Sequence, residues 1–495
     1  MKGWRAINTS VWSFRSWLGL DKAMGTRTLL LIAGLLSAVG VGVLTVKFGV
    51  VGAMVVPALW LGVIYCIFLY KKPELGLMTI LLYGFVLPFF AREFYPIQFG
   101  IGIEGLFLIT FLATFLGVPK HKWANLSNDL VILTAIWFAI SVLQVANPYG
   151  GSIVGWFQEL RTAGLYGLLV VMLAFLLFDT KQHLNIFIGL IVILSVFASL
   201  NGARQLYYGL LPGEQVFVQD NAITHLIWGQ LRVFSFFTDA GMFGAMQAHI
   251  ALVTGVLIFG PFRLWVKGAL AIATVILLYG MLISGTRGSL FVIVFGAFAA
   301  IMLFKSYKVL VIGVLAGILA LGMLKYTHIG SGNYHIYRLR TALDPQDASL
   351  NLRFENQQIL RNYMKDLPFG GGLGVIGAWG HKYNSDKFLS KVEPDSYWVK
   401  VWAMYGIVGL TIWFCMLLYI IGKCAGYIWN IRDQGLRVKL IALMAASIGT
   451  FFASYGNEVI NRVPALFIVY ITWVFVYVSP KWDKHLEPAA INRHV

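Results

Sequence analysis

The sequence predicts an all-α, polytopic membrane protein: a bundle of about 12 to 14 transmembrane helices with one large loop. Three observations lead to this fold class. Hydrophobic residues make up 59% of the 495 residues and charged residues only 12%, whereas a soluble domain carries about 25% charged residues. The mean hydropathy is +0.77. Many apolar runs approach the length of about 20 residues that a helix needs to cross a bilayer, and a β-barrel would instead show short alternating segments.

Charge and cysteine content exclude other classes. The formal net charge is +17, which in a soluble protein could indicate a nucleic-acid partner. In a membrane protein, basic residues retained in cytoplasmic loops orient the helices, so we expect the lipid bilayer and no nucleic acid as a partner. Cys66, Cys415 and Cys424 lie in or beside apolar runs. Their spacing predicts neither a metal site nor a disulfide framework.

Residues 1–26 are basic and amphipathic, and we interpret them as a cytoplasmic segment at the membrane interface whose tryptophans lie among the headgroups. The apolar run that follows is too long for a cleaved signal peptide. The first two spans could instead form one hairpin that does not fully cross. The spans are expected at residues 27–47, 49–70, 74–91, 101–118, 127–146, 162–178, 183–199, 236–260, 266–284, 288–304, 308–325, 395–420, 438–455 and 463–479.

The distribution of lysine and arginine predicts that both termini are cytoplasmic, because cytoplasmic loops carry the excess of basic residues. The turns expected outside hold mostly single ones, and the polar segment 326–394 then also lies outside. The outer basic residues are Lys47, Arg92, Arg161, Arg287 and Arg462. The basic residues expected in the cytoplasm are Lys71, Lys72, Lys120, Lys122, Lys181, Arg263, Lys267, Lys305, Lys308, Lys423, Arg432, Arg437, Lys439, Lys481 and Lys484.

The segment 326–394 is the longest polar stretch of the chain and lies between two apolar runs. A polar insertion of this length in a compact domain is usually functional. Within it, residues 350–361 have leucine and isoleucine at helical spacing, which predicts an amphipathic helix along the outer surface. The glycine-rich run 368–374 ends that helix. It lacks the lysine and Ser/Thr that close a P-loop, and we interpret it as a mobile hinge.

Two arginines stand out at expected outer ends of spans. Arg232 precedes one span, and Arg287 lies in the short turn 284–289 between two others. An arginine in such a place is either a headgroup anchor or a clamp for a phosphate group, whose oxygens match its planar fork. Two of them at neighbouring helix ends favour an anion site. Asp239 could cap the helix that begins after it.

Four stretches carry a resemblance to a known family. They are RVFSFFTDAGMFG from residue 232, SGTRGSLFVIVF from 284, SLNLRFENQQILRNYMKDLPFGGGLG from 349 and EPDSYWVKVWAMYGIVGL from 393. In order and spacing they resemble the conserved domain of the O-antigen ligase and O-antigen polymerase family, over roughly 230–425. The resemblance implies a bacterial inner-membrane protein with a glycosyltransferase-C-like fold, which takes glycans from undecaprenyl pyrophosphate and needs no metal or other cofactor.

The resemblance also implies how the chain is organised. The family-like core is expected at 230–425, with the periplasmic loop 326–394 inside it. Transmembrane helices at 27–229 precede the core. Further helices and a cytoplasmic tail follow it at 426–495.

Roles for individual residues follow from the resemblance. Arg232 and Arg287 fall where the family has arginines thought to hold the pyrophosphate, and Arg353 falls at the arginine that opens the loop helix. Asp395 stands where ligases of the family have an essential histidine. An aspartate could act there as a general base on the acceptor hydroxyl, or it could only cap a helix. The further candidates are Glu393 and His381 as substitute bases and Arg161 as a supporting residue.

Several functions remain open from the sequence. The loss of the histidine leaves both ligase and polymerase as readings, and the acceptor could be lipid A-core, another glycan or a protein. A flippase or other transporter of lipid-linked glycans would show internal repeats and ionisable groups near the bilayer midplane. We find no repeat, and Glu104 and His249 are the candidates for such groups. The last alternative is a non-catalytic envelope protein whose outer loop binds a protein partner.

Overall fold

The computed structural model describes residues 26–95, 99–327, 332, 334–344, 348–394 and 396–483. The chain divides into two compact units, Met1–Lys72 and Pro73–Val495, and we describe each unit by itself. The described residues are mostly helical, and their strands are limited to one two-residue pair. The predicted all-α membrane class is therefore confirmed. Of the predicted interfacial segment 1–26, all but Thr26 lies outside the described residues.

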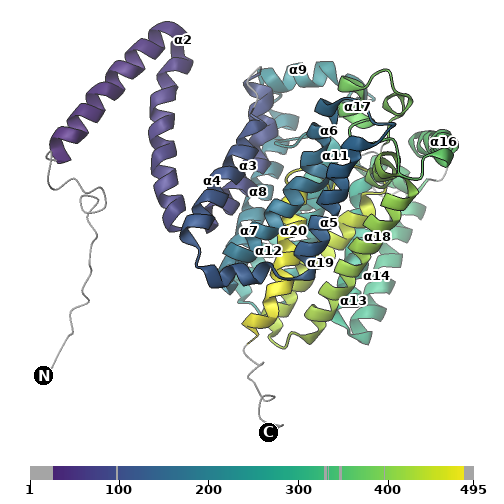
Figure 1. Cartoon of the computed structure of the whole chain (residues 1–495). Helices are drawn as coiled ribbons and strands as arrows, with labels where there is room; N and C mark the ends of the chain where they lie inside the picture. The colour runs from purple at the N-terminus through teal and green to yellow at the C-terminus, as the bar shows by residue number, and fades with distance from the viewer. Residues whose placement is uncertain are drawn as a thin grey trace, which may run out of the picture. The chain divides into compact units, whose positions relative to one another are not determined.

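The first unit contains α2 (Thr26–Lys71) where the sequence predicts two spans. The backbone is helical throughout, but the helix folds back on itself (Figure 1): Trp60 Nε1 donates to Ser37 Oγ at 2.8 Å. A straight helix, rising about 1.5 Å per residue, would hold these residues roughly 35 Å apart. α2 is thus a pair of apolar arms, Ile32–Lys47 and Val56–Lys71. Many large apolar side chains of both arms are exposed, as expected where a helix faces lipid.

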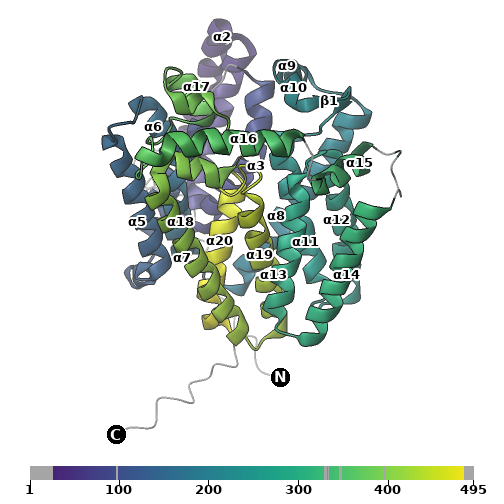
Figure 2. The same cartoon turned by 90° about the vertical axis from the view of Figure 1, so that its right-hand side faces the viewer.

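The second unit is a bundle of long apolar helices (Figures 1 and 2). In the described chain, nine helical stretches are long and apolar enough to cross a membrane, and five are shorter, so the apolar segments agree with the fourteen predicted. A π-helical turn, Arg161–Leu165, joins α6 to α7. The bundle helices are α3 (Glu74–Glu93), α4 (Ile101–Gly117), α5 (Asp129–Leu143), α6 (Ile153–Leu160), α7 (Tyr166–Leu177), α8 (Lys181–Tyr207), α11 (Ala240–Leu257), α12 (Leu264–Ile283), α13 (Gly288–Phe304), α14 (Tyr307–Tyr326), α18 (Tyr397–Asn430), α19 (Gln434–Ala453) and α20 (Ala465–Val478).

Three helices are longer than the sequence predicts. The span expected at 162–178 begins at Ile153, the one expected at 183–199 ends at Tyr207, and the one expected at 395–420 ends at Asn430. In each case polar residues lower the hydropathy of a segment that nevertheless continues as helix. Hydropathy indicates which part of a helix can lie in the hydrocarbon core of a membrane. It does not indicate where the backbone hydrogen bonds of the helix end.

The centre of the bundle is formed by α11, α19 and α20, which are buried over most of their length. α13 and α19 approach backbone to backbone. A Cβ at Gly449 would lie 2.3 Å from Val292 O, and a Cβ at Gly296 would lie 3.0 Å from Ala445 O. Small residues permit such close packing between membrane helices. This packing fixes the helix ends from which the candidate site is built.

Most of the long connections gather at one end of this unit, which we call the loop face (Figure 2). It is formed mainly by the described parts of residues 144–152, 208–239, 284–287, 327–396 and 454–464. Its short elements are α9 (Pro212–Asp220), α10 (Ala222–His225), the antiparallel pair β1 (Leu226–Ile227) and β2 (Gln230–Leu231), α15 (Tyr334–Arg340), α16 (Ala348–Tyr363) and α17 (Gly377–Tyr383). Short 3-10 helices occur in this face at Gln144–Ala146, Thr341–Leu343, Met364–Asp366 and Phe388–Lys391, and elsewhere in the unit at Lys120–Leu126 and Ser479–Trp482.

The predicted surface helix at 350–361 is confirmed as α16, which lies across the loop face (Figure 2). Its apolar residues are less buried than an amphipathic pattern suggests. Leu360 is fully buried, but Leu352 and Ile359 are about half exposed. The helix is therefore attached through its C-terminal half.

The glycine run is packed into a break in α18. The break lies at Gly406, where φ is 70° and ψ is −173°. Gly371 N donates to Ala403 O at 2.9 Å, and Gly372 N donates to Met404 O at 3.0 Å. Residues 370–377 are all buried. The interpretation of this run as a mobile hinge is therefore wrong, because its amides are paired and its glycines allow it to touch the helix backbone.

Candidate active site

The turn between α12 and α13 is held from inside the bundle. Gly285 has a φ of 57°, which glycine adopts without strain. Thr286 N donates to Ser284 Oγ at 3.1 Å, and Thr286 Oγ1 donates to Ala240 O at 2.7 Å. Both side chains are buried. The turn therefore places Arg287 at the start of α13 in a fixed position.

Arg232 reaches the same turn from the end of β2. Its Nη2 donates to Thr286 Oγ1 at 3.1 Å and its Nη1 to Thr224 O at 2.8 Å. Arg287 Nη1 donates to Thr341 Oγ1 at 3.4 Å. The structure thus brings the two arginines that the sequence singles out to one place at the loop face, although 54 residues separate Arg232 from Thr286.

A third arginine lies at this turn, which sequence reasoning missed. Arg338 of α15 is 9% exposed, and its Nε donates to Gly285 O at 2.8 Å. A Cβ at Gly285 would lie 3.5 Å from Arg232 Cγ and 3.5 Å from Arg338 Cδ, so the two side chains flank this glycine. We call Arg232, Arg287 and Arg338 the arginine cluster.

The cluster is strongly positive. Burial, and after it the charge of Arg338, lowers the pKa of Arg232 to about 10, and Arg287 contributes in the same direction. Asp239 opposes the shift but does not cancel it. Burial and neighbouring cations that lower the pKa of Arg232 in this way would favour an anion beside it.

A chain of alternating charges runs through the loop face, buried at Lys400 and Glu159 and partly exposed at Arg462 and Asp239. Lys400 Nζ lies 3.0 Å from Glu159 Oε2 and 3.4 Å from Glu458 Oε1. Arg462 Nη2 lies 3.1 Å from Glu458 Oε2, and its Nη1 lies 2.7 Å from Asp239 Oδ2. We call these five residues the ion network. It links α6, α18, the 454–464 connection and the start of α11.

The ion network connects to the arginine cluster through α11. Asp239 caps this helix, since its Oδ1 accepts from Met242 N at 2.8 Å. The carbonyl of Ala240, the next residue, accepts the hydroxyl of Thr286. The cap predicted for Asp239 is therefore confirmed, and the same carboxylate pairs with Arg462.

Acid is expected to destabilise the loop face. Burial favours the neutral carboxyls, but Arg462 holds the pKa of Asp239 below its usual value, and Lys400 with Arg462 does the same for Glu458. Carboxylates of this kind stabilise the fold above their unfolded pKa of about 4, and this contribution is lost as the pH falls through the lower folded values.

The measurement is the thermal unfolding midpoint in detergent from about pH 7 to pH 3. We expect the midpoint to fall below about pH 4. The fall should be smaller in Arg462→Gln, because both carboxyls then lose a cation that lowers their pKa. Equal pH dependence of the two proteins would contradict this role of Arg462.

Comparison with known families supplies the identity of the segment around the cluster. Residues 272–414 match the family described as O-antigen ligase. This segment is therefore similar to an O-antigen ligase domain. No curated protein sequence matches the chain. The expected resemblance to this family is confirmed, and the match includes the stretches that begin at residues 284, 349 and 393 but not the one that begins at residue 232. Together with the apolar helices, the domain supports a bacterial membrane protein of polysaccharide biosynthesis, a glycosyltransferase-type enzyme with a general role in lipid-linked glycan transfer.

The O-antigen ligase-like segment contains part of the site. The match begins within α12 and ends within α18, so it includes Arg287, Arg338 and Lys400. Arg232 and Glu458 lie outside it, and their contacts join the domain to the segments before and after it. The predicted core 230–425 is wider than the match, and its boundaries stay a prediction.

Asp395, the predicted base, lies outside the described residues. The following residue, Ser396, caps α18, since its Oγ accepts from Val399 N at 3.3 Å. Lys400 of the ion network lies at the start of the same helix.

The two substitute bases lie in contact with each other. His381 Nε2 lies 2.7 Å from Glu393 Oε1, and about half of each side chain is exposed to solvent. Glu393 O also accepts from Asn356 of α16 at 3.4 Å. The pair is accessible to solvent, and its glutamate, Glu393, precedes Asp395 by two residues in the chain.

Arg161 and Arg353 lie away from the arginine cluster in the sequence and make other contacts. Arg161, in the π-helical turn, pairs with Glu104 of α4 at 2.8 Å and also donates to Gln158. This ion pair explains why a charged residue such as Glu104 can lie within a predicted span. Arg353 is half-buried on α16. The supporting roles expected for both arginines stay predictions.

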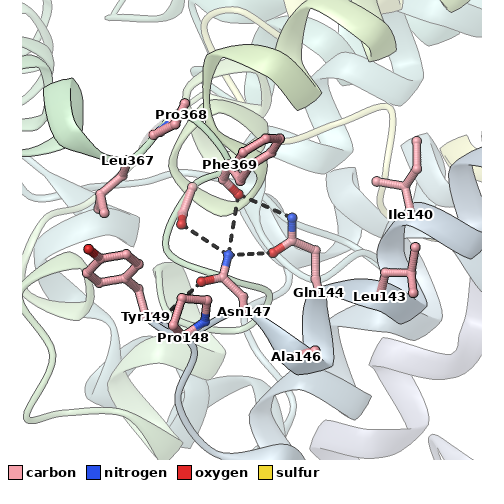
Figure 3. Close-up of a pocket in the computed structure, with 11 residues that line it drawn as sticks. Ile140, Leu143, Gln144, Ala146, Asn147, Pro148, Tyr149, Leu367, Pro368 and Phe369 are labelled. Atoms are coloured by element: carbon pink, nitrogen blue, oxygen red, sulfur yellow. Dashed lines mark hydrogen bonds between the residues drawn. The ribbon is translucent and has the colours of Figure 1, made fainter.

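A pocket of about 380 Å³ lies at the end of α5 (Figure 3). Its polar side chains hold the glycine run: Gln144 Nε2 donates to Phe369 O at 3.2 Å, and Asn147 Nδ2 donates to Gly370 O at 3.1 Å. The remaining surface is mostly apolar. The lining residues are Ile140, Leu143, Gln144, Ala146, Asn147, Pro148, Tyr149, Leu367, Pro368, Phe369 and Gly370. As for metals, no group of three His, Cys, Asp or Glu side chains in the described chain is placed to hold an ion.

Proposed function

We propose that this protein transfers a glycan from an undecaprenyl-pyrophosphate-linked donor to a hydroxyl acceptor at the periplasmic face of the bacterial inner membrane, as an O-antigen ligase or polymerase. The observation that carries the proposal is the convergence of Arg232 and Arg287 on one buried turn, in a chain that matches the O-antigen ligase family over residues 272–414. Guanidinium groups match the oxygens of phosphate and pyrophosphate in geometry and charge.

The proposal places the loop face in the periplasm and both termini in the cytoplasm. Support comes from the opposite end of the bundle, where basic residues gather in the short connections, as cytoplasmic loops require. These basic residues are Lys120, Lys122, Lys181, Arg263, Lys305, Arg432 and Lys481.

The reaction is a single displacement. Arg232 and Arg287 bind the pyrophosphate of the donor while the carrier chain stays in the bilayer. Asp395 takes the proton of the acceptor hydroxyl, and the hydroxyl oxygen attacks the anomeric carbon. The bond from that carbon to the pyrophosphate oxygen breaks, and its electron pair leaves with undecaprenyl pyrophosphate. The arginines stabilise the negative charge that develops on the leaving group.

This reaction inverts the anomeric configuration and requires no nucleotide or metal, since the pyrophosphate linkage supplies the energy. The acceptor is lipid A-core, a second lipid-linked glycan or a protein side chain. His381 and Glu393, which contact each other, are the alternative base. If Asp395 is the base, Asp395→Asn loses activity and His381→Ala retains it.

The test is deletion of the gene in its native host, followed by complementation. We expect Arg287→Ala at normal expression to lower the surface glycan product roughly 100-fold, the size of effect seen when one donor to a developing anion is removed. Arg263→Ala is the matched control, because Arg263 is exposed at the opposite end of the bundle. Product is measured on gels together with the undecaprenyl-linked pool.

The pattern of products separates the remaining functions. Loss of long chains with single repeats still attached indicates a polymerase. Long chains that build up on the carrier lipid without reaching an acceptor indicate a ligase. Donor that accumulates on the cytoplasmic side of the membrane would instead indicate transport, and the proposal would then be wrong. Wild-type behaviour of Arg287→Ala would remove this arginine from the mechanism.

A further inference from the structure

The tip of the β1–β2 hairpin carries a tryptophan in an unfavourable backbone conformation. The register of the two strands leaves Trp228 and Gly229 as the turn residues. φ is 52° at Trp228 and 74° at Gly229. Two-residue hairpin turns with positive φ at both positions favour asparagine or aspartate followed by glycine, and a bulky side chain at positive φ is a rare, strained exception. The folding of the hairpin therefore does not explain why its tip is a tryptophan.

The ring of Trp228 is held in place but is not buried. Its centre lies 6.0 Å from the ring of Tyr334 and 5.9 Å from that of Tyr337, both on α15. The two tyrosines are three residues apart and so lie on one side of the helix. Trp228 is 67% exposed and Tyr337 is 45% exposed. Figure 2 shows β1 and α15 together at the loop face. We call Trp228, Tyr334 and Tyr337 the aromatic platform.

The aromatic platform is joined to the candidate site through Arg232. This residue directly follows β2, and its backbone N donates to His225 O at 2.8 Å while its Nη1 donates to Thr224 O at 2.8 Å. Its Nη2 reaches the α12–α13 turn at Thr286 Oγ1. Trp228 precedes Arg232 by four residues, so their Cα atoms are at most about 14 Å apart. The hairpin thus holds an aromatic ring close to a residue proposed to bind pyrophosphate.

A sugar fits this combination of groups. In a lipid-linked glycan the first sugar is bonded directly to the pyrophosphate, so a site that binds the pyrophosphate has the first sugars beside it. One face of a pyranose consists largely of C–H groups, whose weak positive charge complements the negative face of an indole ring. Stacking also removes apolar surface of both rings from water. Exposed aromatic rings also occur among lipid headgroups, but a ring that only enters lipid needs no strained turn position.

We propose that the aromatic platform, with Trp228 as its main contact, binds a sugar of the lipid-linked donor by stacking, close to the pyrophosphate. The inference rests on the proposed function and adds a subsite for the glycan to it. Through this contact the protein binds a glycosylated carrier lipid more tightly than a sugar-free one. Once the glycan is transferred, undecaprenyl pyrophosphate lacks the contact, which favours its release.

The experiment measures the binding of two lipids to the purified full chain in detergent. One is the lipid-linked glycan extracted from the deletion strain, and the other is undecaprenyl pyrophosphate, which carries no sugar. The main variant is Trp228→Asn, because asparagine removes the ring and is favoured in this turn. Trp228→Phe keeps a ring. Tyr208→Asn is the matched control, at an aromatic residue of the loop face that is 89% exposed. Arg287→Ala reports on the pyrophosphate site, and thermal unfolding reports on folding.

Wild type is expected to bind the glycosylated lipid more tightly than undecaprenyl pyrophosphate. Trp228→Asn should weaken binding of the glycosylated lipid roughly tenfold and that of the sugar-free lipid by less than about twofold, since one ring contact is lost. Trp228→Phe should lie between wild type and Trp228→Asn. The unfolding midpoint of Trp228→Asn should stay close to that of wild type, because relief of the turn strain offsets the lost contacts with the tyrosines. Tyr208→Asn should bind both lipids as wild type does.

The other outcomes separate this inference from the proposed function. If wild type binds both lipids equally, or Trp228→Asn binds the glycosylated lipid as wild type does, the sugar subsite is wrong while the pyrophosphate site stands. Equal weakening of both lipids by Trp228→Asn would also contradict the subsite, and the same loss in Tyr208→Asn would assign these rings to the membrane interface. If wild type binds neither lipid, or Arg287→Ala binds both as wild type does, the proposed function is wrong and the subsite falls with it.

Discussion

Replacing Lys400 with methionine is expected to remove most of the folded protein. The ammonium group is 7% exposed and lies between Glu159, which is 1% exposed, and Glu458, which is 11% exposed. Methionine has a similar length but no charge, so two buried carboxylates would share only the charge of Arg462. Removal of one partner from a buried ion pair costs about 3–5 kcal/mol. That cost is comparable to the whole free energy of unfolding of many domains, about 5–15 kcal/mol.

The measurement is the yield of monodisperse protein in detergent and its thermal unfolding midpoint. Lys423→Met is the matched control on the same helix. Lys423 pairs with Asp129 at 2.6 Å, but its side chain is 31% exposed, and exposed pairs contribute about 0–1 kcal/mol. Equal yields of the two variants would contradict the importance of burial.

A second substitution tests the cause of the loss. In the double variant Lys400→Met/Glu159→Gln, one of the two uncompensated carboxylates is removed. We expect this variant to recover part of the yield, because a buried amide costs less than a buried charge without a partner. Failure to recover, with Glu159→Gln alone well folded, would show that Lys400 has another role.

The sequence predicts the bundle well because lipid imposes a simple rule on it. Apolar runs of sufficient length must be helices, and the predicted segments have counterparts among the apolar helices of the described chain. The errors lie where that rule does not apply. The stretch from Ile153 to Arg161 is helical although it contains Gln158 and Glu159, because its polar groups are paired inside the protein. Such pairing is invisible to hydropathy.

Some residues of the candidate site could likewise be predicted from the sequence, and others could not. Arg232 and Arg287 could be found from sequence, because an arginine at the end of an apolar run is unusual. Arg338 lies in a polar segment that holds other arginines, and nothing local separates it from Arg340. Its role depends on the folding of α15 against the α12–α13 turn, which is a tertiary contact. The expectation for Asp395 stays a prediction.

The ion network could not be predicted from the sequence either, because its residues lie far apart in the chain. Lys400 meets Glu159 and Glu458, which come from the first third and the end of the chain. Each of these residues reads as an ordinary charge at a helix end. Their joint burial ties α18 to the cap of α11, and α11 in turn holds the arginine turn through Ala240. Stability of the loop face and geometry of the arginine cluster are therefore coupled.

The last prediction concerns the break in α18. Gly406→Ala is expected to abolish activity and lower the yield of folded protein. At φ 70° and ψ −173° the backbone lies in a region used almost only by glycine, and strain of this kind costs about 1–3 kcal/mol. A Cβ would also lie 2.0 Å from Pro368 O and 2.5 Å from Gly370 N. The glycine run cannot stay in place against such a side chain.

Displacement of that run would reach the ion network. Gly377 follows shortly after the run, and a Cβ there would be 3.7 Å from Lys400 Nζ, so we expect movement of the run to open the network to water. Gly422→Ala is the matched control in the same helix, since nothing lies within 4 Å of its Cβ position. Alanine there should be neutral or stabilise the helix by about 0.5–1 kcal/mol. Wild-type unfolding and activity in Gly406→Ala would mean that the break in α18 is not needed, whereas loss in Gly406→Ala alone would show that the backbone shape at Gly406 is needed.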